Sequence, residues 1–309
     1  MRYRTVGLFI ALAAVWGTAF VAIKAGLTVF PPVLFAALRY DIAGVLMLGY
    51  AASVTDLRPR GWRSWATIVV GATLLIAAYH ALLFVGETDP AVTSAAAAVI
   101  VSLSPVLTTA WARLFLPGER LAVTGLVGLA LGLAGVVVLA DPEPGALLAG
   151  GVVAKFEVFG AAAAFALGSV LTRRLDADLP IETMEAWSMI GGAVLLHAVA
   201  VLRPSESLAA ITWTVEGILA LGYLAVVASA LGFLVYFRLL AELGPIEINL
   251  VSYVAPVFAA VVGWLLLGET VSINTIVGFV LVVIGFALVK REAISAEWPR
   301  IYALLRGRE

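Results

Sequence analysis

Residues 104–120, SPVLTTAWARLFLPGER, return in altered form about 150 positions later as residues 255–270, APVFAAVVGWLLLGET. Both copies place a proline inside an apolar run and a Gly-Glu pair shortly after that run. Two glycines that follow the first copy, Gly128 and Gly135, also recur 150 positions later. Because the shift persists across two successive apolar runs, it predicts an internal duplication of the chain.

The duplicated units consist of apolar runs that are long enough to cross a membrane. Hydrophobic residues make up 63% of the 309 positions, charged residues 13%, and the mean hydropathy is +1.09. A soluble domain of this size cannot hide so much apolar surface from water, whereas a bilayer takes roughly 20 apolar residues per crossing. The runs lie approximately at residues 6–25, 32–53, 65–85, 92–115, 121–139, 152–172, 182–202, 216–237, 246–267 and 273–290.

These runs predict an all-α membrane protein with ten transmembrane helices arranged as two inverted five-helix repeats. Hydrocarbon cannot satisfy backbone groups, and the runs are too long and too uniformly apolar for barrel strands. Since each repeat has an odd number of crossings, the two repeats have opposite orientations. We expect the first repeat at residues 1–145, the second at 146–292, and a cytoplasmic tail at 293–309.

Basic residues fall mainly on one side of this predicted topology. With the N-terminus inside, the inner loops and tails hold fifteen of the 19 basic residues, whereas Lys155 and Arg203 fall outside. The positive-inside rule then places both termini in the cytoplasm of a multi-pass cell-membrane protein. The inner basic residues are Arg2, Arg4, Arg58, Arg60, Arg63, Arg113, Arg120, Arg173, Arg174, Arg238, Lys290, Arg291, Arg300, Arg306 and Arg308.

Several function classes are excluded by composition. The chain has no cysteine, only His80 and His197 as histidines, and a net charge of −1, so we expect no metal, no cofactor and no nucleic-acid partner. It contains no Walker A, His-Glu-x-x-His or Gly-x-Ser-Gly motif, so we expect no enzyme. A Ser–His80 dyad is the remaining enzymatic alternative. A non-transporting sensor or assembly subunit, with the segment 291–309 on the inner leaflet, is the other alternative.

Two prolines lie well inside apolar runs, and they occupy the same position in the two repeats. Pro105 and Pro256 each remove a backbone donor and crowd the preceding turn, which predicts a kink in the fourth and ninth helices. Paired breaks in inverted repeats are typical of a substrate site or hinge of an alternating-access carrier. The alternative is that both prolines only curve their helices for packing.

The sequence resembles the EamA-type members of the drug/metabolite transporter superfamily. The resemblance rests on Trp16-Gly17-Thr18-Ala19-Phe20, Lys24, Pro32 and Arg39, together with the proline segments, the Gly-Glu pairs and the glycine pairs. It implies ten helices, cytoplasmic termini and a central cavity lined mainly by helices 1, 3, 4, 6, 8 and 9. Small four-helix relatives carry an acidic residue in helix one, but residues 11–25 of this chain contain none. Cation antiport by such a carboxylate is therefore not expected here.

Polar and aromatic residues within the runs are the candidate substrate-binding residues, because ionisable groups in hydrocarbon are costly. An alternative for Lys24 is an ammonium at the outer interface, and for Arg39 a structural bond to helix-end carbonyls or to a carboxylate. The alternative for His80 is a hydrogen-bonded packing residue without a role in transport. Glu182, at the start of the seventh helix, is expected to interact favourably with the helix dipole, and the role of Glu185 is left open. The candidates are Trp16, Lys24, Arg39, Tyr79, His80, Trp187, Tyr223, Asn249 and Tyr253.

The predicted function is transport of small metabolites, such as amino acids or related polar or amphipathic compounds, with export as the predicted direction.

Close helix packing is predicted at five glycines, because small residues let backbones approach. These are Gly128, Gly132, Gly135, Gly278 and Gly285. Apart from the lipid bilayer and the substrate we expect no partner, and since ten helices can enclose a cavity, we expect a functional monomer.

Overall fold

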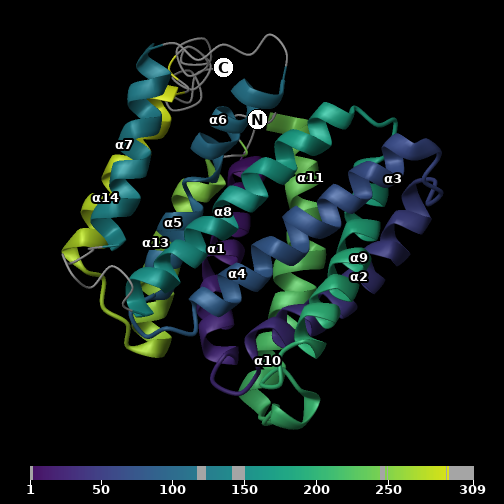
Figure 1. Cartoon of the computed structure of the whole chain (residues 1–309), viewed down its shortest axis with the longest axis horizontal. Coiled ribbons are helices and arrows are strands. Elements are labelled where there is room, and N and C mark those ends of the chain that lie inside the picture. Colours follow the sequence, from purple (N-terminus) through teal and green to yellow (C-terminus); the bar gives the residue numbers. More distant parts are fainter. Residues whose placement is uncertain are drawn as a thin grey trace.

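The computed structural model describes residues 3–116, 123–140, 150–243, 248, 250–289 and 291 (Figure 1). All regular elements in these ranges are helical, which confirms the predicted all-α class. In chain order they are α1 (Tyr3–Gly26), α2 (Pro32–Val54), α3 (Gly61–Val70), η1 (Gly71–Ala78), α4 (Tyr79–Gly86), α5 (Ser94–Val101), α6 (Ser104–Phe115), α7 (Val123–Ala140), α8 (Gly150–Leu175), α9 (Ile181–Val201), η2 (Leu208–Ala210), α10 (Val215–Gly222), η3 (Tyr223–Leu231), α11 (Gly232–Leu243), α13 (Val251–Leu267) and α14 (Ile273–Val289).

These elements form about ten membrane crossings. Within the described ranges, eight helices are long and apolar enough to span a bilayer, and Val251–Leu267 and Ile273–Val289 are shorter apolar helices. The third and eighth crossings are each continuous through a π-helical segment, η1 and η3 respectively. The start of α1 and the end of α14 lie at the same end of the bundle, as an even number of crossings requires (Figure 1).

The two repeats pack against each other in matched pairs. The second helices of the repeats, α2 and α9, form one extensive contact, and the fifth helices, α7 and α14, form another. The segment η1 packs on α9, and its counterpart η3 packs on α2. This exchange of equivalent contacts is the pattern expected of two repeats related by a pseudo-two-fold axis.

The pair α7–α14 depends on glycine, as the sequence predicted. A Cβ built on Gly135 would lie 2.7 Å from the carbonyl oxygen of Gly278, and one on Gly128 would lie 2.5 Å from that of Gly285. These backbones are therefore too close for any side chain, which confirms close helix packing at both glycine pairs.

The two prolines occupy different places in their helices. The fourth crossing is interrupted at Ser102 and Leu103, and Pro105 stands in the first turn of α6, where its missing N–H costs nothing. Pro256 lies inside a continuous α13, and the preceding turn is at Leu250. A break therefore accompanies Pro105 directly, but in the second repeat it lies six residues before Pro256.

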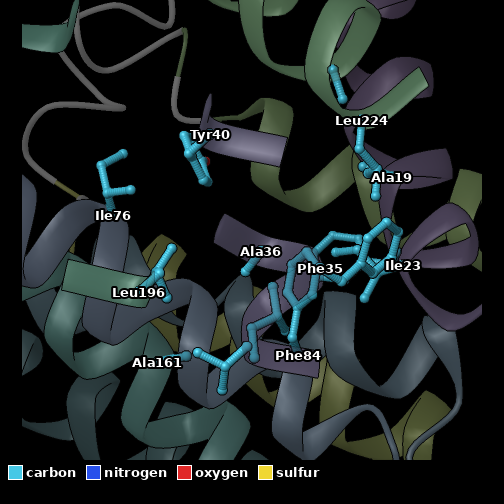
Figure 2. Close-up of a cluster of buried hydrophobic side chains, with 14 of the residues drawn as sticks. Ala19, Ile23, Phe35, Ala36, Tyr40, Ile76, Phe84, Ala161, Leu196 and Leu224 are labelled. Atoms are coloured by element: carbon cyan, nitrogen blue, oxygen red, sulfur yellow. The ribbon is translucent and has the colours of Figure 1, made fainter. Parts of the chain in front are cut away.

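The interior of the bundle is a cluster of buried side chains contributed by both repeats (Figure 2). Phe35, Ala36 and Tyr40 of α2 belong to the same cluster as Ile76 of η1 and Leu224 of η3. Large apolar side chains are instead exposed on the outer faces of the helices, where lipid replaces water. The end of the bundle opposite to the start of α1, formed by residues 27–31, 87–93, 202–214 and 268–272, is called the distal end below.

Candidate functional site

The candidate site is built around the two π-helical segments. They lie at equivalent places in the repeats, since η1 begins at Gly71 and η3 begins at Tyr223. A π-helical turn is rare, and it occurs frequently at functional sites. Each segment also offers a backbone carbonyl to a side chain: Ile76 O contacts His80 Nδ1 at 2.9 Å, and Ala228 O accepts from Trp16 Nε1 at 3.1 Å.

Arg39 connects α2 to the second π segment. Its side chain is buried, and Nε donates a hydrogen bond of 3.0 Å to Ser229 Oγ in η3. The guanidinium carbon lies 5.2 Å from the centroid of the Tyr40 ring. The sequence predicted a carbonyl or carboxylate partner as the structural role of Arg39, and this is corrected: among described residues its hydrogen-bond partner is a hydroxyl.

Both ring nitrogens of His80 have partners. Tyr40 Oη lies 2.7 Å from Nε2, and Nδ1 is bound to the carbonyl of Ile76. A carbonyl can only accept, so Nδ1 carries the proton and Nε2 accepts from the tyrosine. Tyr79 packs against the His80 ring with a centroid distance of 4.5 Å. Because His80 is committed to tyrosine and backbone, no Ser–His80 dyad is present among the described contacts.

Trp16 and Tyr223 hold α1 against the eighth crossing. Tyr223 Oη donates to Val15 O at 2.9 Å, in addition to the indole bond of Trp16 to η3. The Trp16 ring also packs against Phe233 and Tyr236, with centroid distances of 5.9 and 5.5 Å. The structure thus brings five of the predicted residues to the π segments: Trp16, Arg39, Tyr79, His80 and Tyr223.

The other predicted residues lie elsewhere or outside the described ranges. Trp187 donates to Leu57 O at 2.9 Å near the loop between α2 and α3, and Lys24 lies at the distal end. The Tyr253 ring packs on Phe286 at a centroid distance of 4.6 Å, away from η1 and η3. Asn249 is outside the described residues. A substrate-binding role for these four residues remains a prediction.

Two polar side chains near the π segments were not among the predicted binding residues. Ser229 is fully buried and accepts the Arg39 bond, but a serine in an apolar helix carries no sequence signal of its own. Glu185 of α9 is 8% exposed and forms no ion pair with a described residue. Its signal was a carboxylate inside an apolar run, which the sequence left without a role.

A second group of charged residues closes the distal end. The ammonium of Lys24 donates three hydrogen bonds of 2.8 Å each, to the carbonyl oxygens of Glu87, Asp89 and Val92. Lys24 therefore binds the loop of residues 87–93, between α4 and α5, to the end of α1. The position of Lys24 relative to the outer interface remains a prediction, but its ammonium is bound to loop carbonyls.

Glu269 and Glu87 flank this contact in different ways. The Glu269 carboxylate accepts from the backbone N–H of Ser94 at 3.0 and 3.1 Å and from its hydroxyl at 3.1 Å, which satisfies the start of α5. The Glu87 side chain is 0% exposed, and neither carboxyl oxygen has a hydrogen-bond partner among the described residues. Burial, and secondarily the nearby Glu269, raise the pKa of Glu87 well above its ordinary value, although Lys24 acts in the opposite direction.

A cavity of about 190 Å³ lies beside this group at the distal end, between the starts of α5 and α14. Its polar lining includes Thr93, Lys155 and Asn274. The Lys155 ammonium is already bound to the carbonyls of Leu139 and Ala140, at 3.1 and 3.3 Å, and thereby satisfies the end of α7. The cavity is therefore peripheral to the residues at η1 and η3.

Comparison with known proteins identifies the family of this fold. A model of the EamA-like transporter family matches residues 4–140 and again residues 154–291. The chain belongs to the EamA-like transporter family. The double match agrees with the duplication seen in the sequence and with the paired contacts of the structure.

Curated relatives of this EamA-family chain are named as transporters. It is 32% identical over 281 residues to the protein named uncharacterized inner membrane transporter YedA of Escherichia coli K12, covering 88% of this chain and 87% of YedA. It is 29% identical over 293 residues to the uncharacterized transporter YvbV of Bacillus subtilis 168, covering 94% and 93%. A crystal structure with 23% identity has the same fold, with a TM-score of 0.64 over 96% of this chain and 100% of the other.

Proposed function

We propose that this EamA-family transporter exports a small metabolite that bears a carboxylate, such as an amino acid, by alternating access around η1 and η3. The observation that carries the proposal is the pair of π segments at equivalent positions in the two repeats, the second of which is hydrogen-bonded to the buried Arg39. Inverted repeats supply two nearly equivalent conformations, and substrate sites in such folds lie where helices are irregular at the repeat interface.

Arg39 is the group best suited to bind the carboxylate. A guanidinium has five N–H donors in a planar fork, and the only one that is bound to a described residue is at Nε. The terminal NH₂ groups can therefore bind a carboxylate in a bidentate manner. The bond to Ser229 fixes the direction of the fork, and the ring of Tyr40 supports its face.

Glu185 supplies a charge of the opposite sign in the same interior. It belongs to α9, which packs against both α2 and η1, and the Tyr40 hydroxyl lies within electrostatic reach of both Glu185 and Arg39. A buried cation and a buried anion, neither of which forms an ion pair with a described residue, match a zwitterion better than a simple anion. Trp16 and Tyr223 add aromatic walls on the side of α1.

The proposed orientation of the chain assigns the two ends of the bundle to the two sides of the membrane. Basic residues on the loops at the end where α1 begins support a cytoplasmic location of that end, with the distal end facing outward. In the described structure the distal end is held by Lys24 and Glu269, which corresponds to a carrier that is closed to the outside. Each repeat, residues 1–145 and 146–292, contributes one π segment, and a single chain is the functional unit.

The proposal is tested by comparing metabolites released from cells that express the wild-type chain and cells that express the Pro105→Ala/Pro256→Ala double variant. We expect at least one carboxylate-bearing compound to accumulate in the medium of wild-type cells to a much higher level than in the medium of cells with the double variant. A broad panel without any difference, with membrane insertion of both proteins verified, would contradict export. Pro59→Ala, in the loop between α2 and α3, is the matched control and should release the compound as the wild type does.

A further inference from the structure

The acidic side chains at the distal end differ in the hydrogen bonds that they accept. Glu206 accepts from the backbone N–H groups of Val33 and Leu34 at 3.2 and 3.0 Å, and so satisfies the start of α2. Glu269 does the same for α5 through Ser94. Glu87 is the exception in this group, because it is fully buried and accepts nothing from a described residue.

Lys24 is not an ion-pair partner that would make Glu87 stable as a carboxylate. An ammonium has three N–H donors, and all three of Lys24 are bound to backbone carbonyls of the 87–93 loop. A carboxylate without a donor is strongly disfavoured in a buried position, so the neutral acid is the form that fits this conformation. The neighbouring Glu269 carboxylate favours the same form.

We propose that Glu87 is a proton-binding site of the distal gate, occupied while Lys24 holds the 87–93 loop closed. When the loop leaves α1, water reaches the carboxyl group and the O–H bond breaks: the proton passes to water on the distal side and the electron pair stays on the carboxylate. Opening is therefore coupled to the loss of one proton. From the proposed function, alternating access, this proposal takes only one assumption, which is that the distal end opens.

Other titratable groups around the loop do not replace Glu87 in this role. Glu269 already caps α5, and Asp89 accepts from the backbone N–H of Ala91 at 2.8 Å. The charged and titratable groups on the elements packed around Glu87 include Lys24, Asp89, Lys155, Glu157 and Glu269, together with the Tyr79 hydroxyl. Among the described acids at the distal end, Glu87 combines complete burial with the absence of a partner.

The chain offers a direct test because it contains no cysteine. Val92 is 0% exposed in the closed loop, whereas its neighbour Ala91 is exposed. The test uses a Val92→Cys variant in lipid nanodiscs, where a charged maleimide reaches both faces of the membrane. The cysteine at position 92 is expected to react with the maleimide only when the loop opens. The labelling rate is divided by that of Ala91→Cys at each pH, which removes the pH dependence of the thiol itself.

We expect this rate ratio to rise with pH by up to about tenfold per unit in the Glu87 protein, as coupling to one proton requires. In Glu87→Gln, which mimics the neutral acid, the ratio should stay at its low value at every pH. Ala96→Cys, 3% exposed on α5, is a second reporter if Val92→Cys does not insert.

A ratio that does not change with pH in the Glu87 protein, or that changes equally in Glu87→Gln, would overturn the proposal. Labelling requires no substrate, so these results do not depend on whether transport has been found. Conversely, a failure to detect export leaves the expected ratio unchanged, and the two proposals therefore fail separately.

Discussion

Arg39 of the first repeat and Ser229 of the second are joined by a hydrogen bond of 3.0 Å in the interior of the bundle. Ser188 of α9 lies as far from the start of its helix as Arg39 does in α2, but it donates to Ile68 O in α3 at 3.4 Å and carries no charge. The two repeats therefore share their helix packing but not their chemistry. The symmetric packing suits a mechanism with two conformations. Arg39, which has no charged counterpart at Ser188, suits a substrate that binds in one orientation.

Arg39→Lys is expected to raise the KM for transport about 10- to 100-fold. Lysine keeps the charge but lacks the planar fork, and hydrogen bonds to charged groups contribute about 1.5–3 kcal/mol. The measurement is concentration-dependent uptake into proteoliposomes. Ser229→Ala should raise the KM less, about fivefold, because only the orientation of the fork is lost. Ser53→Ala removes an exposed hydroxyl that binds its own helix, and an equal effect there would contradict the assignment.

Replacing Pro105 is expected to slow transport more than replacing Pro256. The fourth crossing is interrupted two residues before Pro105, and alanine there permits α5 and α6 to join, whereas α13 is already continuous through Pro256. We expect a reduction of about tenfold in the transport rate for Pro105→Ala, with a smaller reduction for Pro256→Ala. The measurement is the initial transport rate in proteoliposomes with equal protein content. Equal rates for the wild type, Pro105→Ala and Pro256→Ala would refute a hinge at these prolines.

Gly135→Ala is expected to lower the thermal stability of the protein. Its Cβ would lie 2.7 Å from the Gly278 carbonyl oxygen, and overpacking of this kind costs about 1–3 kcal/mol. Gly49→Ala is the matched control, since a Cβ at Gly49 meets nothing within 4 Å. That control should be neutral or slightly stabilising, because alanine favours helix more than glycine does. Melting temperatures in the same detergent measure both, and similar values for both variants would contradict the close α7–α14 crossing.

Glu87 is expected to make the folded protein less stable as the pH rises. The pKa of this acid is raised in the folded state, so the folded chain keeps the proton after the unfolded chain has lost it. The contribution of Glu87 to the stability of the folded protein is complete below its pKa in the unfolded chain, about 4.3 for glutamate. This contribution is lost as the pH rises through its pKa in the folded chain. Melting temperatures of wild type and Glu87→Gln should therefore diverge with increasing pH. Parallel curves would show that Glu87 is already ionised in the fold.

The membrane fold was predictable because lipid leaves few choices to an apolar chain. Apolar length fixed the crossings to within a few residues, although the third helix begins at Gly61 rather than near residue 65. The glycine pairs were predictable as well, because a small residue in lipid has few uses other than close packing. That the glycines of α7 and α14 face each other was not predicted, because the sequence alone does not say which helices are neighbours.

The candidate site was predictable only in part. Trp16, Arg39, Tyr79, His80 and Tyr223 were visible as polar or aromatic residues in apolar runs, but their partners depend on tertiary contacts. The π segments leave no mark in hydropathy, since their composition equals that of an ordinary apolar helix. The isolation of Glu87 was also hidden, because it follows from Lys24 using all its donors on distant carbonyls.

The central claim, that the chain is an alternating-access carrier, is tested most directly by counterflow in proteoliposomes. The purified protein is reconstituted with a high internal concentration of the unlabelled compound found by metabolite profiling, and labelled compound is added outside. A carrier predicts a transient accumulation of label above its equilibrium level, and this overshoot should be strongly reduced in Arg39→Lys. Label that only rises to equilibrium, or does not enter at all, would contradict the claim.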